Sequence, residues 1–594
     1  MPLPQSALAS VTGIETQYVQ LGGGSAAVLP PRVAVFAQGQ TGVSFPSAKA
    51  QYTSPGAAGK VYGFKSAIYL ALRELLPANG DGVGVLPVTV YPLTDAAGAS
   101  AATGDITPSG TTTEAGQYTL RIGGVSSLPF AIPAGAVDVN LTLAKMGFAC
   151  NSILYMPVTL TYAYGSVTAS AVSGTGNGTI GTLTVAAPAL PGQYKLVCNT
   201  AVANGGVFTL TDPLGNVLST TLTMTPGAGT ATPFTVNGLG FTLTDGTTDF
   251  GVGASFTITV PATKLNLTFA WKGTVGNDCK IELIGPNVGL VVAVTAMAGG
   301  LLDPVVDPAL GLMGNVWEVF CLNGLPIANT TALDAYANFN EGRWGITTHQ
   351  PLVVFTGTRH STVPLASAVS STRKTDRTNI VIPAPGSPNL PFVIAARAIA
   401  RMAIVASSDP SSDYNGLPLS TTGLVPGDDS VQWDWPTRDQ ALNLGCSTTE
   451  VVDGVIQLGD IITMYAPTGE IPPGFRDLKT IVKAMNIIYN LAIILNAPQW
   501  KRAALVPSGQ VLTNPNARTP AALIAELSAL ADELGKAAII SDPDFTKKQI
   551  SAAINSGDPD RIDATEIFKL SGNSKRKVVN FLFGYYYGTP ALAA

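Results

Sequence analysis

Charged residues are scarce in this chain. Only 12% of its 594 residues are Asp, Glu, Lys or Arg, about half of the roughly 25% usual in soluble proteins. Hydrophobic residues make up 46%, and the mean hydropathy is +0.30. A monomer needs surface charge to keep its copies apart in solution. The deficit therefore favours a protein whose surface is largely covered by copies of itself, and the length suggests about three or four domains.

Histidine and cysteine are also rare. The two histidines, His349 and His360, are eleven residues apart and offer no set of ligands or catalytic triad. No cysteines form a C-x-x-C pair, and their wide spacing predicts unpaired core residues rather than a zinc site or a disulfide framework. The cysteines are Cys150, Cys198, Cys279, Cys321 and Cys446. We therefore expect no catalytic residues, no metal and no cofactor, and we expect that the protein is not an enzyme.

No segment has the length and composition of a membrane span. Residues 283–302 are interrupted by Pro286 and several glycines, and residues 392–406 carry Arg397 and Arg401 and fall short of the roughly 18 to 20 residues that a span requires. Residues 1–5 have no basic or apolar stretch, so no signal peptide is expected. The net charge of −5 is spread without long runs, which argues against nucleic acid as a partner. We expect the chain to stay in the cytoplasm in which it is made.

Strand and helix patterns alternate in two separated parts of the chain, residues 32–94 and 265–375. Apolar strands are expected at residues 33–36, 85–91 and 317–322, and helices at residues 61–76 and 331–340. Such alternation favours a mainly parallel sheet covered on both faces. We predict one discontinuous α/β body.

The interruption between these two parts is rich in Gly, Thr, Val and Ala. We predict a β-rich insertion at residues 95–169 and an immunoglobulin-like module of the all-β sandwich class at residues 170–264, facing outward. Residues 170–261 hold one basic residue, Lys195, and three acidic ones, Asp212, Asp245 and Asp249. Stretches such as 206–213 and 256–260 alternate with period two, as strands do.

Residues 376–571 form a mixed α+β C-terminal region in this interpretation. Helices are expected at residues 392–406, 475–495 and 519–536, and strands at residues 441–465. The helix at 519–536 carries four leucines at spacings of three and four, which predicts one buried apolar face. They are Leu523, Leu527, Leu530 and Leu534.

Both ends of the chain have the pattern of extended arms, at residues 1–31 and 572–594. The second contains K-R-K-V-V-N-F-L-F-G-Y-Y-Y, a strand with two apolar or aromatic faces, which must pair within a sheet. That sheet belongs either to the same subunit or to a neighbouring copy, and the residues leave both open. The expected arm-strand residues are Ile14, Thr16, Tyr18, Val19, Leu21, Val578, Val579, Phe581, Leu582, Phe583, Tyr585 and Tyr587, and the expected hinges are Gly22, Gly23, Gly24 and Gly572.

Some residues fit two interpretations. Trp433 and Trp435 suit a sugar-stacking site or, more commonly, packing at a core or interface. Arg397 and Arg401 lie one turn apart and suit either carboxylate pairing or a solvated stripe, and we favour the stripe.

A G-x-G-x-x-G match at residues 176–181 lies among turns with no following helix, so no phosphate site is expected there.

In several segments the chain resembles the tail sheath proteins of contractile-tailed bacteriophages of the Mu-like type. Their order along the chain carries the resemblance, and the inserted module at residues 170–261 is an addition to the sheath pattern. The segments are residues 62–91, 273–278, 336–344, 391–419 (with Asp409-Pro410), 443–465 and 557–562, followed by the terminal strand.

The resemblance implies a structural protein that assembles as six-fold rings stacked around a tail tube. Terminal arms would join the subunits, and the sheath would contract to drive the tube through the host envelope. Implied partners are further copies of the chain, the tail tube protein, and baseplate and tail terminator proteins, with no nucleic acid and no membrane insertion. The implied location is the sheath of the virion tail, assembled in the host cytoplasm. Polar contacts with the tube would lie near the C-terminal region, where the candidates are Lys479, Lys483, Lys501 and Arg502, each with the alternative of an ordinary solvated side chain.

Two alternatives stay open beside a phage sheath. One is the sheath of a phage-derived contractile injection system of the tailocin type. The other is a self-assembling surface protein or adhesin whose β modules bind carbohydrate, against which the missing signal peptide speaks.

Overall fold

The computed structural model describes residues 26–227, 229–345, 348–419, 424–467, 474–510 and 512–575. The chain divides into two compact units. The larger comprises Pro30–Ser407 and Tyr414–Ile481. The smaller comprises Ser408–Asp413, the chain from Val482 onward and the N-terminal residues up to Leu29. The predicted arm strands, and the hinges Gly22 to Gly24, lie outside the described residues.

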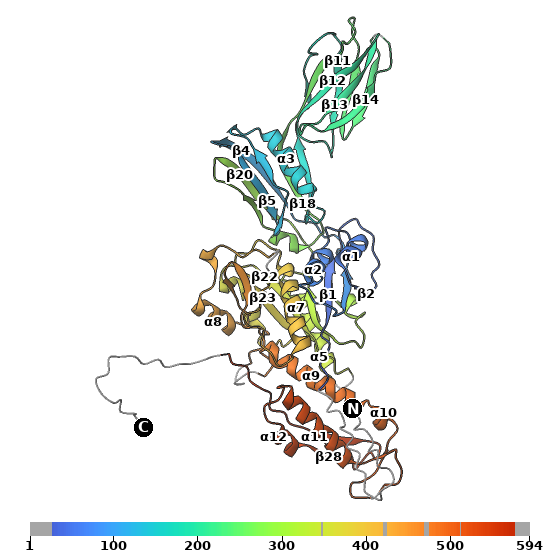
Figure 1. Ribbon diagram of the computed structural model, residues 1–594, viewed down its shortest axis with the longest axis vertical. Coiled ribbons are helices and arrows are strands. Elements are labelled where there is room, and N and C mark those ends of the chain that lie inside the picture. The colour runs from blue at the N-terminus through green and yellow to red at the C-terminus, as the bar shows by residue number, and fades with distance from the viewer. Residues whose placement is uncertain are drawn as a thin grey trace, which may run out of the picture. The chain divides into compact units, whose positions relative to one another are not determined.

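A six-stranded sheet in the order β2-β3-β1-β21-β22-β23 forms the centre of the larger unit (Figure 1). The five strands from β3 to β23 run parallel, and β2 pairs antiparallel with β3 at one edge. Every residue of β3, β21, β22 and β23 is buried, as expected for a parallel sheet covered on both faces. The strands are β1 (Arg32–Gln38), β2 (Ala50–Tyr52), β3 (Val88–Leu93), β21 (Glu318–Asn323), β22 (Val353–Thr358) and β23 (Asn379–Pro383). The predicted α/β alternation is thus observed, and the sixth strand lies beyond the expected boundary at residue 375.

Helices connect these strands and cover them. On one face Phe36 stacks on Tyr91, with ring centroids 4.8 Å apart, and meets the edge of Tyr336 from α5. The expected helix at 61–76 is two helices, because Gly63 ends the first with a φ of +90°. The helices of this part are α1 (Pro55–Tyr62), α2 (Ala67–Leu75), α4 (Asp307–Leu310), α5 (Thr330–Trp344), α6 (Val363–Ala366) and α7 (Pro391–Ser408).

The arginines of α7 do not form a solvated stripe, and that expectation was wrong. Arg397 and Arg401 both pair with the carboxylate of Asp81, which lies in the turn after α2. The side chain of Arg397 is only 3% exposed, and that of Arg401 25%. Both guanidinium groups also donate to main-chain oxygens, Arg397 to Leu419 and Arg401 to Pro418. The carboxylate and carbonyl oxygens offset the cost of burying the charge.

Two helices, α7 and α9 (Leu478–Leu495), are long and apolar enough by length and composition alone to cross a membrane. The structure buries 72% of that stretch in α7 and 44% in α9, so α7 in particular has the environment of a core helix. The expectation that no segment has the length and composition of a membrane span was therefore wrong for these two helices, because α7 extends beyond residues 392–406 and α9 also reaches 18 residues. All five cysteines are buried and none forms a disulfide, as predicted. Burial raises the pKa of the Cys446 thiol to about 12.

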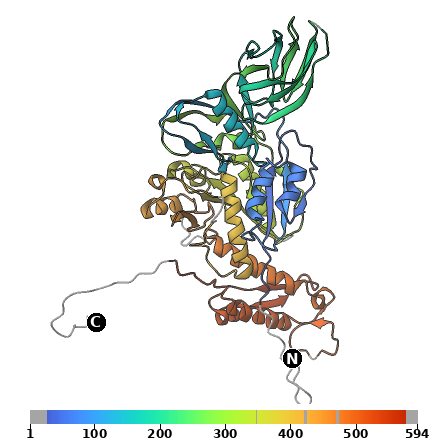
Figure 2. The same cartoon turned by 45° about the horizontal axis from the view of Figure 1, so that its top comes forward.

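The inserted residues between β3 and β21 form two further groups of strands (Figures 1 and 2). The first contains the sheet β20-β4-β18-β9, with β8 beside β4, and the sheet β19-β5-β6, with β7 beside β5. It also contains α3 (Val139–Asn151), a helix that the sequence analysis did not expect. The strands are β4 (Thr103–Thr112), β5 (Gly116–Ile122), β6 (Val125–Ser126), β7 (Phe130–Ile132), β8 (Gly135–Ala136), β9 (Val158–Tyr164), β18 (Ala262–Phe269), β19 (Ile281–Ile284) and β20 (Leu290–Ala298). Residues 265–298, expected in the α/β body, therefore pair with the insertion.

The second group is a sandwich of two sheets, β10-β17-β12-β13-β14 and β11-β16-β15. Side chains from both sheets share one core, including Leu196, Phe208, Phe241 and Phe256. The strands are β10 (Thr168–Ala169), β11 (Thr179–Val185), β12 (Gly192–Val202), β13 (Gly205–Thr211), β14 (Val217–Thr223), β15 (Ala231–Val236), β16 (Leu239–Thr244) and β17 (Ser255–Val260). We call residues 168–260 the sandwich module. Its immunoglobulin-like identity and its outward orientation stay predictions.

The later part of the larger unit contains a short helix and a hairpin. The helix is α8 (Trp435–Asn443), where part of a strand was expected, and Asp434 caps it by accepting from the amide of Thr437. The hairpin is β24 (Thr449–Val452) with β25 (Val455–Leu458). Trp433 is 7% exposed and donates to the carbonyl of Ser361 at 2.7 Å, whereas Trp435 is 71% exposed. The two rings therefore have different surroundings, and Trp433 has the packing role.

The smaller unit is built on α9 and α11 (Pro520–Lys536) (Figure 1). The predicted apolar face of α11 is confirmed, because its four leucines are between 0% and 6% exposed. They pack against α9, α12 and the hairpin of β28 and β29. The remaining elements are α10 (Pro498–Lys501), β26 (Ala504–Leu505), β27 (Ala517–Arg518), α12 (Pro543–Gln549), β28 (Ser551–Ile554) and β29 (Ile562–Thr565).

Candidate functional site

Three polar residues on one face of α9 hold both ends of the described chain. They are Lys483, Asn486 and Asn490, which lie three and four residues apart and therefore on one side of the helix. Their exposed fractions are 1%, 1% and 5%. We call this set the α9 anchor. Buried polar groups need hydrogen-bond partners, and here the partners come from the N-terminal and C-terminal segments.

The N-terminal segment is held by the two asparagines. The amide of Ala27 donates to Oδ1 of Asn490, and the carbonyl of Ala27 accepts from Nδ2 of the same side chain, both at 2.8 Å. The amide of Leu29 donates to Oδ1 of Asn486 at 2.8 Å. The asparagine side chains thus bond this segment much as a neighbouring strand would. Ala27 and Leu29, which belong to the predicted arm of residues 1–31, are thus fixed to α9.

Lys483 holds the C-terminal segment. Its Nζ donates to the carbonyl of Ser571 and to Oδ1 of Asn573, both at 2.8 Å. Nδ2 of Asn573 donates in turn to the carbonyl of Ser411 at 2.7 Å. Just before this point, the chain bonds to residues 539–541, with Ser571 donating to Ile539 at 3.0 Å. Residues 569–573 are therefore fixed by several hydrogen bonds.

The loop that contains Ser411 belongs to the same polar cluster. Burial alone would raise the pKa of Asp409, but hydrogen bonds from Ser411 and Ser412 and the nearby charge of Lys483 outweigh it and lower that pKa. Asp409 accepts from the hydroxyls of Ser411 and Ser412 at 2.6 and 2.5 Å. Its ionised form is therefore favoured near the buried ammonium of Lys483.

The second feature of this unit is the hairpin of β28 and β29. Its register runs from Ser551 opposite Thr565 to Ile554 opposite Ile562. Among the described residues no third strand joins it. Two strands alone have little stability in water, and an open edge is a template for another strand.

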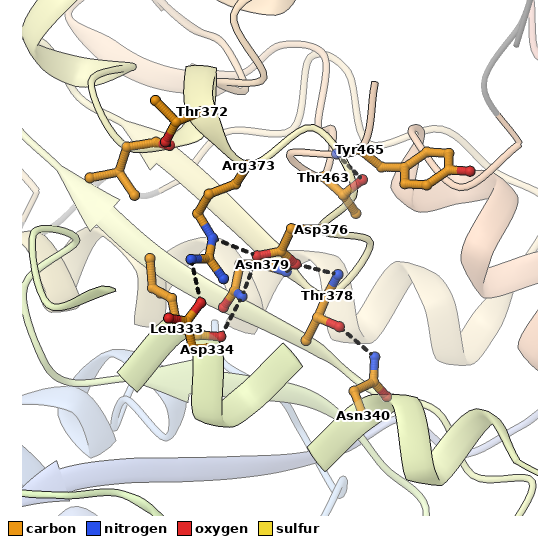
Figure 3. A network of polar contacts seen from close by, with 11 residues as sticks. Leu333, Asp334, Asn340, Thr372, Arg373, Asp376, Thr378, Asn379, Thr463 and Tyr465 are labelled. Atoms are coloured by element: carbon orange, nitrogen blue, oxygen red, sulfur yellow. Dashed lines mark hydrogen bonds and ion pairs between the residues drawn. The ribbon is translucent and has the colours of Figure 1, made fainter. Parts of the chain in front are cut away.

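A separate polar network lies in the larger unit between α5 and the start of β23 (Figure 3). Arg373 donates to Asp376 at 2.9 Å and to Asp334 at 2.6 Å. Asp376 also accepts from the amides of Thr378 and Asn379 at 2.9 and 3.0 Å. Burial would lower the pKa of Arg373, but the two carboxylates outweigh it and raise that pKa.

This network lines a surface hollow of about 480 Å³. A second pair, Arg377 with Glu341, also lines it, and Arg377 lies over the rings of Trp344 and Phe475. Because each of these carboxylates is paired with an arginine, the arrangement suits fixing the chain ahead of β23 rather than acid–base chemistry. No cluster of three or more His, Cys, Asp and Glu residues is arranged for a metal in the part of the chain that the structure describes.

The candidate tube contacts have different environments in the structure. Lys479 and Lys483 are buried, at 9% and 1% exposed, so neither has the solvated surroundings that the sequence allowed. Lys501 and Arg502 are exposed around the end of α10. Gly572 is exposed, and a Cβ there would meet nothing within 4 Å. Its role as a hinge stays a prediction.

Sequence reasoning missed Asn486 and Asn490, although a signal was present. Asparagine is a poor residue for a helix interior because its side chain competes for main-chain hydrogen bonds. Two asparagines four residues apart in an otherwise apolar helix therefore indicate that their amides have partners elsewhere. The identity of those partners, more than 450 residues away, could not be read from the pattern.

No family model matches the chain. In sequence it is similar to the Mu-like prophage FluMu tail sheath protein of Haemophilus influenzae, with 26% identity over 322 residues. The match covers 51% of this chain and 63% of that protein, so it spans less than two thirds of the relative's length. The predicted resemblance to Mu-like tail sheath proteins is confirmed by this match.

Two sheath tail proteins are among the solved structures that align with this chain. One is from Listeria innocua, with a TM-score of 0.40 and 10% identity, and the alignment covers 92% of this chain and 94% of that one. The other is from Desulfitobacterium hafniense, with a TM-score of 0.39 and 10% identity over 91% of this chain and 96% of that one.

Proposed function

We propose that the protein is a tail sheath subunit of a contractile phage tail or of a related injection system. The observation that carries the proposal is the sequence match over half the chain to a prophage tail sheath protein. The low share of charged residues supports it, because a subunit covered by its own copies needs less solvated surface. A structural role also needs no reaction centre.

The proposed assembly consists of six-subunit rings stacked helically around a tail tube in the virion, built in the host cytoplasm. Contraction exchanges one packing of rigid subunits for another, so the work comes from contacts between subunits rather than from hydrolysis. The other partners are the tube protein, the baseplate and the tail terminator. Lys501 and Arg502 are the better candidates for tube contacts, since both are exposed.

The arms are proposed to join neighbouring subunits by adding strands to their sheets. The open hairpin of β28 and β29 supports this as the acceptor, because added strands would complete a larger sheet. An arm of about ten residues would form several main-chain hydrogen bonds worth a net ~0.5 to 1.5 kcal/mol each. Such a connection survives while the contacts between rigid bodies change.

The α9 anchor supports a mechanical role for the points where the arms begin. Both described ends are bonded to the same helix, so a pull on either arm acts on α9. Asn573, the residue after the predicted hinge Gly572, is held by Lys483 and Ser411, so we propose that the C-terminal arm changes direction after Asn573 rather than at Gly572. The N-terminal arm is expected to bend at Gly22 to Gly24.

Electron microscopy of the purified full-length chain and of a chain that ends at Lys575 tests this function. The truncation keeps the anchor and removes only the proposed arm strand. We expect the full-length chain to form tubes or helical sheaths, and the truncated chain to fold normally but remain unassembled, because the strand that joins neighbours is missing.

Truncated chains that build sheaths like those of the full-length chain would contradict arm exchange. Flat lattices of the full-length chain would instead favour a self-assembling surface protein, and persistent monomers would contradict the proposed function as a whole. Circular dichroism of both chains controls for loss of the fold.

A further inference from the structure

Two of the three acidic residues in the sandwich module come together at one end of it. Asp245 follows β16 directly, and Asp249 lies four residues later in the loop before β17. The amide of Asn204, in the turn between β12 and β13, donates to Oδ1 of Asp249 at 2.9 Å. This contact locates Asp249 at the turn of that hairpin.

The carboxylate of Asp245 is buried and has no hydrogen-bond partner among the described residues. Leu239, Phe241 and Leu243 of β16 face the core, and Asp245 continues this row of alternate residues. It is only 3% exposed, and neither of its carboxylate oxygens has a hydrogen-bond partner among the described residues. The carboxylate of Asp249 is close enough to add like-charge repulsion to the cost of burying Asp245. A buried carboxylate beside a like charge is costly unless a positive charge or a proton compensates it.

No basic residue of the module is near enough to provide that charge. Its one basic residue is Lys195 on β12. Lys195 pairs with Thr211, whereas the turn at this end joins Val202 to Gly205. The seven residues from Lys195 to Val202 span about 23 Å along a strand, well beyond the reach of a lysine side chain.

The loop that carries the two acids is held in place by the glycine-rich segment at residues 176–181. Oδ1 of Asn177 accepts from the amide of Thr248 at 2.9 Å, and its Nδ2 donates to the hydroxyl of Thr247 at 2.8 Å. A Cβ on Gly246 would lie 2.0 Å from Oδ1 of Asn177, so the close approach requires glycine there. The segment that resembled a phosphate motif therefore shapes the acidic loop.

We infer that Asp245 and Asp249 bind a divalent cation of the calcium class at this end of the sandwich module. Carboxylate oxygens are the ligands that Ca²⁺ prefers, and exposed Asp249 leaves room for water as further ligand. With two carboxylates the dissociation constant is expected on the order of 10⁻⁴ to 10⁻³ M, as in weak calcium sites. The inference does not depend on the proposed function, since it concerns this module alone.

Hydrogen–deuterium exchange of the full-length chain tests the site locally, with EDTA, 5 mM CaCl₂ or 5 mM MgCl₂. Bound calcium must leave before the loop can open and its amides exchange. With a dissociation constant near 0.5 mM, amide exchange in residues 244–251 should therefore be about tenfold slower in 5 mM calcium than in EDTA. Asp245→Asn and Asp249→Asn should each abolish the effect. Asp212→Asn is the matched control, because Asp212 already accepts from the amides of Leu214 and Asn216. The Asp212→Asn chain should therefore show the same slowing of exchange in calcium as the wild-type chain.

An absence of slowing in the wild-type chain would overturn the inference. So would equal slowing in wild type and Asp245→Asn, because the calcium would then be bound by other carboxylates. If calcium has no effect and Asp245→Asn slows exchange in EDTA, Asp245 is neutralised by a proton and the cation site is rejected. Should Asp245→Asn fail to fold, the comparison of wild type with Asp249→Asn decides.

Discussion

Glu566 follows β29 in the smaller unit and lacks any compensating charge in the described chain. Both of its carboxylate oxygens are buried, and neither has a hydrogen-bond partner among residues 26–227, 229–345, 348–419, 424–467, 474–510 and 512–575. Burial raises its pKa to about 7 from the ordinary value of 4.5. Because the folded state favours the protonated form, its contribution to stability is fully present below about pH 4.5 and is lost as the pH rises through about 7.

We therefore expect the smaller unit to be less stable at pH 8 than at pH 5, and Glu566→Gln to reduce this difference and stabilise the unit at pH 8. Thermal unfolding followed by fluorine NMR of 5-fluorotryptophan at Trp500 reports on this unit. The control is Glu533→Gln, since Glu533 has a partner in Lys536 at 2.7 Å. A Glu566→Gln chain with the wild-type pH dependence would show that Glu566 has another source of compensation.

The arginines of α7 are a second case at the level of single residues, because a solvated stripe was expected and a buried ion pair was found. Their spacing correctly placed Arg397 and Arg401 on one helix face, but their shared carboxylate belongs to Asp81, 316 and 320 residues away in sequence. A charged side chain on an apolar helix has no local mark that separates a solvated position from a paired one. The two arginines are paired because the folded chain brings Asp81, in the turn after α2, next to them.

At the scale of elements, α9 is the helix that both described chain ends share. Its apolar composition was enough to predict a helix at residues 475–495, and the structure has it at Leu478–Leu495. The lysine at position 483 was considered for the tube, yet it holds Ser571 and Asn573 instead. Charge-assisted bonds of this kind contribute roughly 1.5 to 3 kcal/mol each.

Lys483→Met should release the C-terminal segment while keeping most of the packing volume. We expect amide exchange at residues 571–575 to become at least about tenfold faster, since each 1.4 kcal/mol is a factor of ten. Exchange mass spectrometry measures it. Lys501→Met, at an exposed position of the same unit, is the control and should leave these amides unchanged. Identical exchange in the two variants would mean that Lys483 does not hold this segment.

At the scale of the whole molecule, the sandwich module is an insertion with adjacent ends. The amide of Gly165 donates to the carbonyl of Pro261 at 2.9 Å, and Tyr164 of β9 is the cross-strand partner of Ala262 of β18. The module has its own core. Insertions of this kind are tolerated where the two ends meet at the surface.

Replacing residues 165–261 by Asn-Gly should therefore join β9 to β18 as an ordinary hairpin, because a two-residue turn suits directly opposed strand residues. We expect the shortened chain to fold and to assemble like the full-length chain. Circular dichroism and electron microscopy check the two outcomes. An insoluble product would show that the module stabilises the rest of the chain, and a soluble but unassembled one that it takes part in subunit contacts.

The sequence by itself determined the elements whose signal is local. Examples are the apolar face of α11, the buried parallel strands β1, β21 and β22, and the low-charge β-rich insertion, because side-chain periodicity of 3.6 or 2.0 residues is a property of neighbouring residues. The tertiary structure alone decided the rest: the pairing of β18 and β20 with β4, the carboxylate shared by two arginines, and the meeting of both chain ends on α9. These contacts join residues from 88 to 463 positions apart, and their partners are set by which surfaces pack together, which no local pattern records.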